Sequence, residues 1–141
     1  MQSSCTILPP RVSVILQDEY NKVYFEGKKQ FLLALGGKIE PDENIYNTVK
    51  RELFEEVGLG LTDLNKITYL YKKEFENRHC FYFFVKFSSK NTKLLFAKDI
   101  SVVSKNIYSL NYIPGSMFYP YFLKNIILQQ TQIISFSELI I

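Results

Sequence analysis

Apolar positions recur along this chain with two different periods, and the shorter period indicates β-strands. Five runs are rich in β-branched, aromatic or leucine residues and are bounded by polar residues or glycine, a pattern typical of strands. They are Arg11–Gln17, Lys22–Glu26, Phe31–Leu35, Lys66–Glu74 and Cys80–Phe87. Polar residues at 18–21 and near 77–79 lie between neighbouring runs, where we expect turns.

The second period appears once, clearly, and predicts an α-helix. Every fourth residue is apolar across one segment, namely Ile45, Val49, Leu53 and Val57. This spacing forms one stripe on a helix. Residues 42–44 (DEN) supply N-cap and dipole-favourable side chains at its start, and Gly58 suits the left-handed residue that ends many helices.

The second half of the chain is harder to interpret. Residues 88–107 contain a Lys-rich loop and an apolar stretch without clear period, whereas Tyr108–Ile113 is a candidate strand. Met117–Leu128 is a candidate helix that Pro120 restricts to a start at or near that residue. Strands on both sides of a central helix, with a second helix late, predict one α/β domain with a mixed sheet over residues 1–141.

Composition is that of a globular protein, with 47% hydrophobic and 22% charged residues. The net charge of +3 is too small to indicate a nucleic-acid binder. Six of the 14 acidic residues lie between Glu40 and Glu56, whereas from Asn77 to Ser137 the only acid is Asp99. This distribution favours a metal site that serves an anionic substrate, with a solvated basic surface as the open alternative.

The expected compartment is the cytoplasm. Cys5 and Cys80 show neither metal-ligand spacing nor a disulfide framework, which favours a reducing environment. The N-terminal residues lack the pattern of a signal peptide, and no apolar run is long enough to cross a membrane. The apolar tail at 133–141 is a candidate last strand or oligomer contact, so a homodimer remains open.

Three glutamates crowd one side of the predicted helix. At about 100° per residue, Glu52 and Glu56 lie about 40° apart, and Glu55 lies about 60° to the other side of Glu52. Like charges at these spacings repel and weaken a helix. A hard cation such as Mg²⁺ or Mn²⁺ removes that repulsion, because it prefers carboxylate oxygens. A charged surface helix with chance acids is the alternative explanation.

The whole segment GKIEPDENIYNTVKRELFEEVGL, Gly37–Leu59, resembles the Nudix signature G-x5-E-x7-R-E-U-x-E-E-x-G-U, where U is a bulky aliphatic residue. The matching residues are Gly37, Glu43, Arg51, Glu52, Leu53, Glu55, Glu56, Gly58 and Leu59. Seven of these positions demand one residue type, so chance agreement at a given start is about one in a billion.

The resemblance implies a Nudix-type α-β-α sandwich and hydrolysis of a diphosphate linkage by metal-activated water. It implies Mg²⁺ or Mn²⁺ held first by Glu52 and Glu56, with the Gly37 carbonyl as a further ligand. Glu55 is implied as a metal ligand or as the general base. Arg51 is implied to orient the glutamates through an ion pair.

Other residues receive weaker assignments. Glu43 is expected to fix the loop before the helix, and we expect Lys38 and Phe31 to contact the substrate. His79, the only histidine, is expected to be an exposed turn residue, with a substrate contact as the alternative.

The candidates for a fourth acidic ligand are Asp99, Glu74 and Glu76. Leu35 stands where many members have proline.

The resemblance leaves the substrate open. A nucleoside di- or triphosphate derivative, including an oxidised nucleoside triphosphate, is the first expectation. ADP-ribose, dinucleoside polyphosphates and a capped RNA end are alternatives, the last being the one nucleic-acid partner considered. A catalytically retired nucleotide-binding module and an isoprenoid diphosphate isomerase are alternatives of another class. The retained box glutamates argue against the first, and Cys5 and Cys80 show no pattern that favours the second.

Overall fold

The structure, a computed structural model, describes residues 7–28, 30–88, 107–113 and 117–131. Its centre is a mixed six-stranded sheet with the strand order β4-β5-β1-β3-β2-β6. The strands are β1 (Arg11–Gln17), β2 (Val23–Lys28), β3 (Phe31–Lys38), β4 (Leu64–Phe75), β5 (Arg78–Phe87) and β6 (Ile107–Leu110). The helices are α1 (Ile45–Val57), the short 3-10 helix η1 (Leu61–Asp63) and α3 (Leu123–Gln130).

Strand β1 lies inside the sheet, and this position explains why its sequence is mostly apolar. It pairs in parallel with β5 and antiparallel with β3, so both of its edges are hydrogen-bonded. Its side chains alternate between the two faces, and both faces are covered. The residues from Val12 to Gln17 are therefore all buried.

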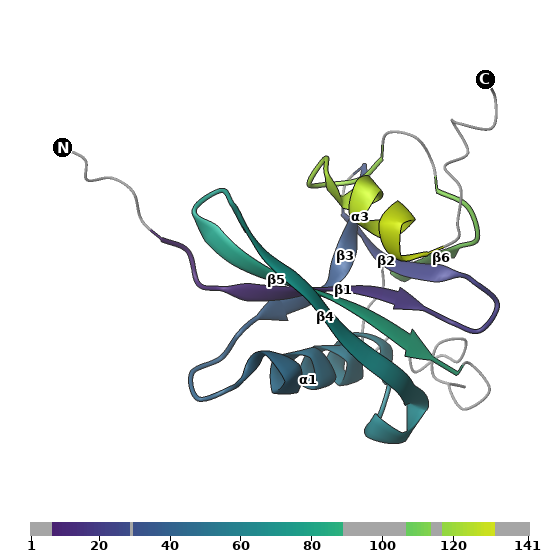
Figure 1. Ribbon diagram of the computed structural model, residues 1–141, viewed down its shortest axis with the longest axis horizontal. Helices are drawn as coiled ribbons and strands as arrows, with labels where there is room; N and C mark the ends of the chain where they lie inside the picture. The colour runs from purple at the N-terminus through teal and green to yellow at the C-terminus, as the bar shows by residue number, and fades with distance from the viewer. Residues whose placement is uncertain (1–6, 29, 89–106, 114–116, 132–141) are drawn as a thin grey trace.

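The two helices cover opposite faces of the sheet, as Figure 1 shows. Val12, Val14 and Leu16 belong to one core with the apolar stripe of α1. Ile15, Phe25 and Tyr82 belong to a second core with Leu123 and Ile127 of α3. The predicted α-β-α sandwich with a mixed sheet is therefore confirmed.

Helix α1 has the ends that its sequence indicates. Asn44 is the N-cap, and its side chain accepts a hydrogen bond from the backbone N–H of Asn47. Gly58 ends the helix in the left-handed conformation at φ 73°. Val49, Leu53 and Val57 are buried, which fixes the helix on the sheet and sets the direction of its other faces.

Several predicted boundaries are wrong. Helix α3 begins at Leu123, later than the expected start at or near Pro120, because residues 121–122 form a turn first. Residues 117–119 are kept out of the helix by the pairing of the Leu32 backbone with Met117 and Tyr119. Strand β2 continues to Lys28, beyond the expected end at Glu26, and β6 ends at Leu110, earlier than expected.

The β4–β5 turn also differs from its prediction. Its central residues are Glu76 and Asn77, both with positive φ, as a two-residue hairpin turn of the primed type requires. His79 therefore lies within β5, half-buried, rather than in an exposed turn.

Some expectations lie outside the described residues, namely those for Asp99, for most of 88–107 and for the tail at 133–141. Within the described ranges, no helix is long and apolar enough to cross a membrane.

Candidate active site

Arg51 is the centre of a cluster of carboxylates on the exposed side of α1. Its Nε and Nη2 donate to the two oxygens of Glu43 at 2.6 and 3.0 Å. Nη1 donates to Glu52 at 2.9 Å and to Glu55 at 3.2 Å. Nη2 also donates to the Lys38 carbonyl at 2.8 Å. These five bonds use the five N–H donors of a guanidinium, so this side chain is fully satisfied.

Glu43 joins the loop before α1 to the helix itself. Its carboxylate accepts hydrogen bonds from Thr48 Oγ1 at 2.9 Å and from the Glu40 backbone N–H at 3.0 Å. The bonds from Arg51, together with these, lower the pKa of Glu43 to about 2. Glu43 is therefore a fixed anion that holds the loop and the arginine in one geometry.

Glu56 and Glu52 are the buried acids of the cluster. Burial raises the pKa of Glu56 to about 8, although the Gly36 backbone N–H donates to its carboxylate at 3.0 Å. Burial also raises the pKa of Glu52, and the ion pair with Arg51 offsets only part of that rise. Both carboxyls lie where a negative charge is poorly solvated, and a bound cation would stabilise that charge.

The double glycine brings the β3 backbone against these acids. Gly36 has φ 141°, and a Cβ there would overlap the Val12 carbonyl of the neighbouring strand. A Cβ on Gly37 would overlap the Glu52 carboxylate. Only glycine fits at Gly36, and the absence of a Cβ at Gly37 leaves room for the Glu52 carboxylate beside the β3 backbone.

The donor set suits a hard divalent cation. Within the described part of the chain, no three Asp, Glu, His or Cys side chains are already arranged to hold one. Arg51 draws one oxygen of Glu52 and one of Glu55 towards itself, while Gly36 binds one oxygen of Glu56. The second oxygen of each carboxylate remains as a donor of the kind that Mg²⁺ and Mn²⁺ prefer. The residues present therefore fit such an ion.

Other predicted site residues lie at different distances from this cluster. Glu55 is 56% exposed and lies at its solvent side. Lys38 ends β3 with an exposed side chain, and its backbone carbonyl belongs to the cluster. Phe31 lies at the other end of β3, where its ring contacts Tyr119 at a centroid distance of 6.0 Å. Of Glu74 and Glu76, the first lies near His79 and the second near Tyr119, both on the β4–β5 hairpin.

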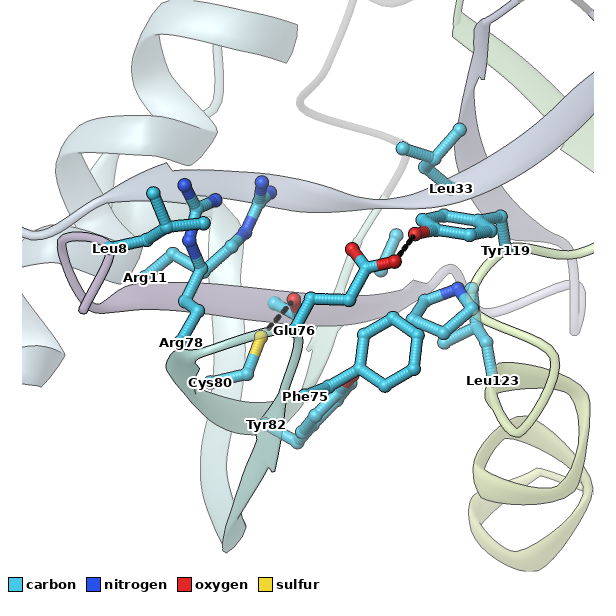
Figure 2. Close-up of a pocket in the computed structure, with 13 residues that line it drawn as sticks. Leu8, Arg11, Leu33, Phe75, Glu76, Arg78, Cys80, Tyr82, Tyr119 and Leu123 are labelled. Carbon is cyan, nitrogen blue, oxygen red and sulfur yellow. Dashed lines mark hydrogen bonds between the residues drawn. The ribbon is translucent and has the colours of Figure 1, made fainter. Parts of the chain in front are cut away.

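A cavity on the α3 face of the sheet escaped the sequence analysis. Figure 2 shows that Arg11 of β1 and Arg78 of β5 line it, together with Cys80, Tyr82 and Tyr119. The available signal was the alternation of β1, because Arg11 shares the inward face of Ser13 and Ile15 and so lies at a position where a charge is unusual.

Comparison with known proteins gives one family and a set of structures. The NUDIX domain model matches residues 4–108. A nudix hydrolase family member from Chromobacterium violaceum matches with a TM-score of 0.63 and 17% identity, over 89% of this chain and 78% of that one. A NUDIX family hydrolase from Clostridium perfringens matches with a TM-score of 0.52 and 20% identity, over 73% of this chain and 81% of that one.

A MutT structure from a study of the Aliivibrio salmonicida and Vibrio cholerae proteins matches with a TM-score of 0.47 and 21% identity, over 54% of this chain and 63% of that one. The present chain thus matches less than two thirds of that MutT chain. No curated protein matches. At these identities the structures show the fold, and the family model, which spans well over half of the 141 residues, shows that this chain belongs to the Nudix hydrolase family.

Proposed function

We propose that this protein is a Mg²⁺- or Mn²⁺-dependent hydrolase that cleaves a diphosphate linkage in nucleoside di- or triphosphate derivatives. The observation that carries the proposal is the Arg51 cluster, in which one guanidinium holds Glu43, Glu52 and Glu55 beside the Gly36–Gly37 backbone. An arginine with all five donors engaged in this way is an ordered support for acids that must keep a fixed geometry.

Each residue of the cluster has a role in this proposal. Glu52, Glu56 and the Gly37 carbonyl would hold the cation. When bound, the cation lowers the pKa of water and neutralises charge on the diphosphate. Glu55, the most exposed of the three acids, would take the proton of the attacking water, with metal binding as its alternative role. Arg51 is a positioning residue, because its contacts are to the acids.

The chemistry balances without further reactants. A water oxygen forms a bond to phosphorus, the bond from that phosphorus to the bridging oxygen breaks, and the bridging oxygen leaves on the second phosphate. The proton released by the water passes to the glutamate. A cytoplasmic location belongs to the same proposal, and the free thiol of Cys80 is compatible with it.

The test is a substrate panel with Mg²⁺ or Mn²⁺, read for phosphate, pyrophosphate and nucleoside monophosphate. The panel contains ordinary and oxidised nucleoside triphosphates, ADP-ribose, dinucleoside polyphosphates and capped RNA. We expect cleavage of at least one member, and Glu56→Gln should lower kcat/KM by about 10³-fold, the scale on which one principal electrostatic contact acts.

Glu74→Gln is the matched control, because Glu74 is 72% exposed and lies outside the cluster. It should keep the wild-type rate. The proposal fails if no member is cut with either metal, or if Glu56→Gln cleaves as fast as the control.

A further inference from the structure

The cavity on the α3 face has one basic end and one aromatic end. Figure 2 shows the guanidinium groups of Arg11 and Arg78 near Leu8, and Tyr119 at the other end. Arg11 is opposite Cys80 in the β1–β5 register, and Arg78 lies two residues before Cys80 on the same face. The parallel pairing of β1 with β5 thus brings both arginines to one place.

Both arginines are incompletely satisfied. The Nε atoms of Arg11 and Arg78 are buried and have no hydrogen-bond partner among the described residues. No carboxylate of the described residues lies within ion-pair distance of either guanidinium. Both side chains are half-buried, but their Nε atoms are not reached by solvent, and buried polar groups are almost always paired. Two such groups in one cavity therefore indicate a ligand that supplies the missing acceptors.

Glu76, the one acid among the described residues that line the cavity, does not fill this role. Tyr119 donates its hydroxyl hydrogen to the Glu76 carboxylate at 2.6 Å, and Figure 2 shows this carboxylate turned towards Tyr119. Ser13 and Cys80, which lie between the two ends, are hydrogen-bonded to each other at 3.2 Å. These four polar side chains therefore have partners, whereas the Nε atoms at the basic end have none among the described residues.

The shape and place of the cavity decide what kind of anion it takes. Its volume is about 190 Å³, below the about 300–1,000 Å³ of pockets that enclose whole drug-sized ligands. It therefore accepts one group of a substrate. Arg11 is paired across the sheet with Lys38, next to Gly37, and Ala34 of the same strand lines the cavity. The basic end of the cavity therefore lies beside the end of β3 that carries Gly37.

We propose that this cavity binds a second phosphate group of the substrate, a monoester outside the cleaved diphosphate, between Arg11 and Arg78. The inference rests on the proposed function and names its substrate class, which is phosphorylated nucleotides such as those with a 2′- or 3′-phosphate. A phosphate monoester matches the site because its three oxygens can accept from two guanidinium forks.

Binding without catalysis provides the first test. Adenosine 2′,5′-bisphosphate, adenosine 3′,5′-bisphosphate, AMP and inorganic phosphate are titrated calorimetrically into the whole protein in EDTA. At least one bisphosphate should bind about tenfold or more tightly than AMP, the scale of a charge-assisted hydrogen bond. Arg78→Gln should abolish this difference. Lys72→Gln, which removes an exposed charge from the same hairpin, should retain it.

Each result of the titration bears on the inference. Equal affinities for AMP and both bisphosphates overturn it. Arg78-dependent binding of inorganic phosphate without any gain for a bisphosphate also overturns it, because the site then serves a free anion. A gain that survives Arg78→Gln places the phosphate elsewhere and overturns it too. Arg78→Lys, which keeps the charge but loses the fork, should retain only part of the gain.

Hydrolysis of NADP⁺ and NAD⁺ gives the second test, because the two share one diphosphate and differ by one 2′-phosphate. The same comparison is made for coenzyme A and its 3′-dephospho form. We expect a lower KM for the phosphorylated member of at least one pair, and Arg78→Gln should raise that KM alone. If neither pair is cleaved but a bisphosphate binds through Arg78, the proposed reaction fails on these substrates and the phosphate site stands. If cleavage shows no preference, the phosphate site fails and the reaction stands.

Discussion

On the α1 face of the sheet, one arginine holds three of four clustered glutamates. On the α3 face, two arginines line a cavity whose one acid among the described residues is bound to Tyr119. Arg51 uses all five of its donors within the protein. Arg11 and Arg78 each leave a buried Nε without a partner in the described part of the chain. On the α1 face the arginine is fully hydrogen-bonded within the protein, and a cation would stabilise the buried acids. On the α3 face an anion would supply the acceptors that the two Nε atoms lack. The α1 face therefore carries the groups proposed for catalysis, and the α3 face carries the groups proposed to bind the substrate.

The largest expected effect is on the pH dependence of stability. The pKa of Glu56 is raised and that of Glu43 is lowered, so the two residues destabilise the protein at opposite ends of the pH range. The pKa of Glu56, raised by burial from 4.5 to about 8, makes the metal-free protein lose stability as pH rises between these values. The pKa of Glu43, lowered to about 2 chiefly by Arg51, makes it lose stability as pH falls from 4.5. In EDTA, the free energy of unfolding should fall by a few kcal/mol from pH 4.5 to 8, at about 1.4 kcal/mol per pKa unit.

Urea denaturation at a series of pH values measures this effect. Glu56→Gln should flatten the decline above pH 4.5 and raise the stability of the metal-free protein at pH 8, although the same change should lower activity. Glu74→Gln should leave the decline intact. An equally steep decline in Glu56→Gln would show that burial of Glu56 is not its cause.

Substitution of Arg51, whose five donors are all bonded, should have the second-largest effect, a loss of catalytic activity. Arg51→Met leaves three acids without their shared donor, so kcat/KM should fall by about 10- to 100-fold, as for other residues that orient metal ligands. The melting temperature should also fall. Arg51→Lys should recover part of both, because an ammonium keeps the charge but cannot form the bidentate bond to Glu43.

The readout is steady-state kinetics over a range of Mg²⁺ concentrations, together with thermal unfolding. Lys50→Met, at the neighbouring position of α1, is the control for loss of one positive charge. If Arg51→Met requires no more Mg²⁺ than Lys50→Met for half-maximal rate, Arg51 does not position the metal ligands.

The smallest expected effect is a gain in stability, and it concerns the α3 face of the sheet. Arg78→Met removes a half-buried arginine whose buried Nε has no partner among the described residues, so the unfolding free energy should rise by about 1 kcal/mol. Denaturant titration in phosphate-free buffer measures this. Lys72→Met should be close to neutral. If Arg78→Met is destabilising, Arg78 has structural partners in solution and the contrast between the faces disappears.

The local sequence was sufficient to predict the helix and its acidic side. The four-residue spacing from Ile45 to Val57, the residues that precede it and Gly58 depend only on neighbours within one or two turns. Helix α3 begins later than Pro120 because residues 121–122 form a turn first, whereas pairing with Leu32, distant in sequence, keeps Met117–Tyr119 extended. His79 was misplaced because the turn consists of only two residues, Glu76 and Asn77.

By itself, the sequence determined the family, the sandwich and the spacing of Arg51, Glu52, Glu55 and Glu56, because these features follow from residue order along one helix and its loop. Only the tertiary structure decided which carboxyls are buried, how closely Gly37 approaches Glu52, and that Arg11 and Arg78 share a cavity. Those features depend on strand pairing between segments far apart in the chain. No local sequence pattern indicates the β1–β5 register that brings Arg11 and Arg78 together.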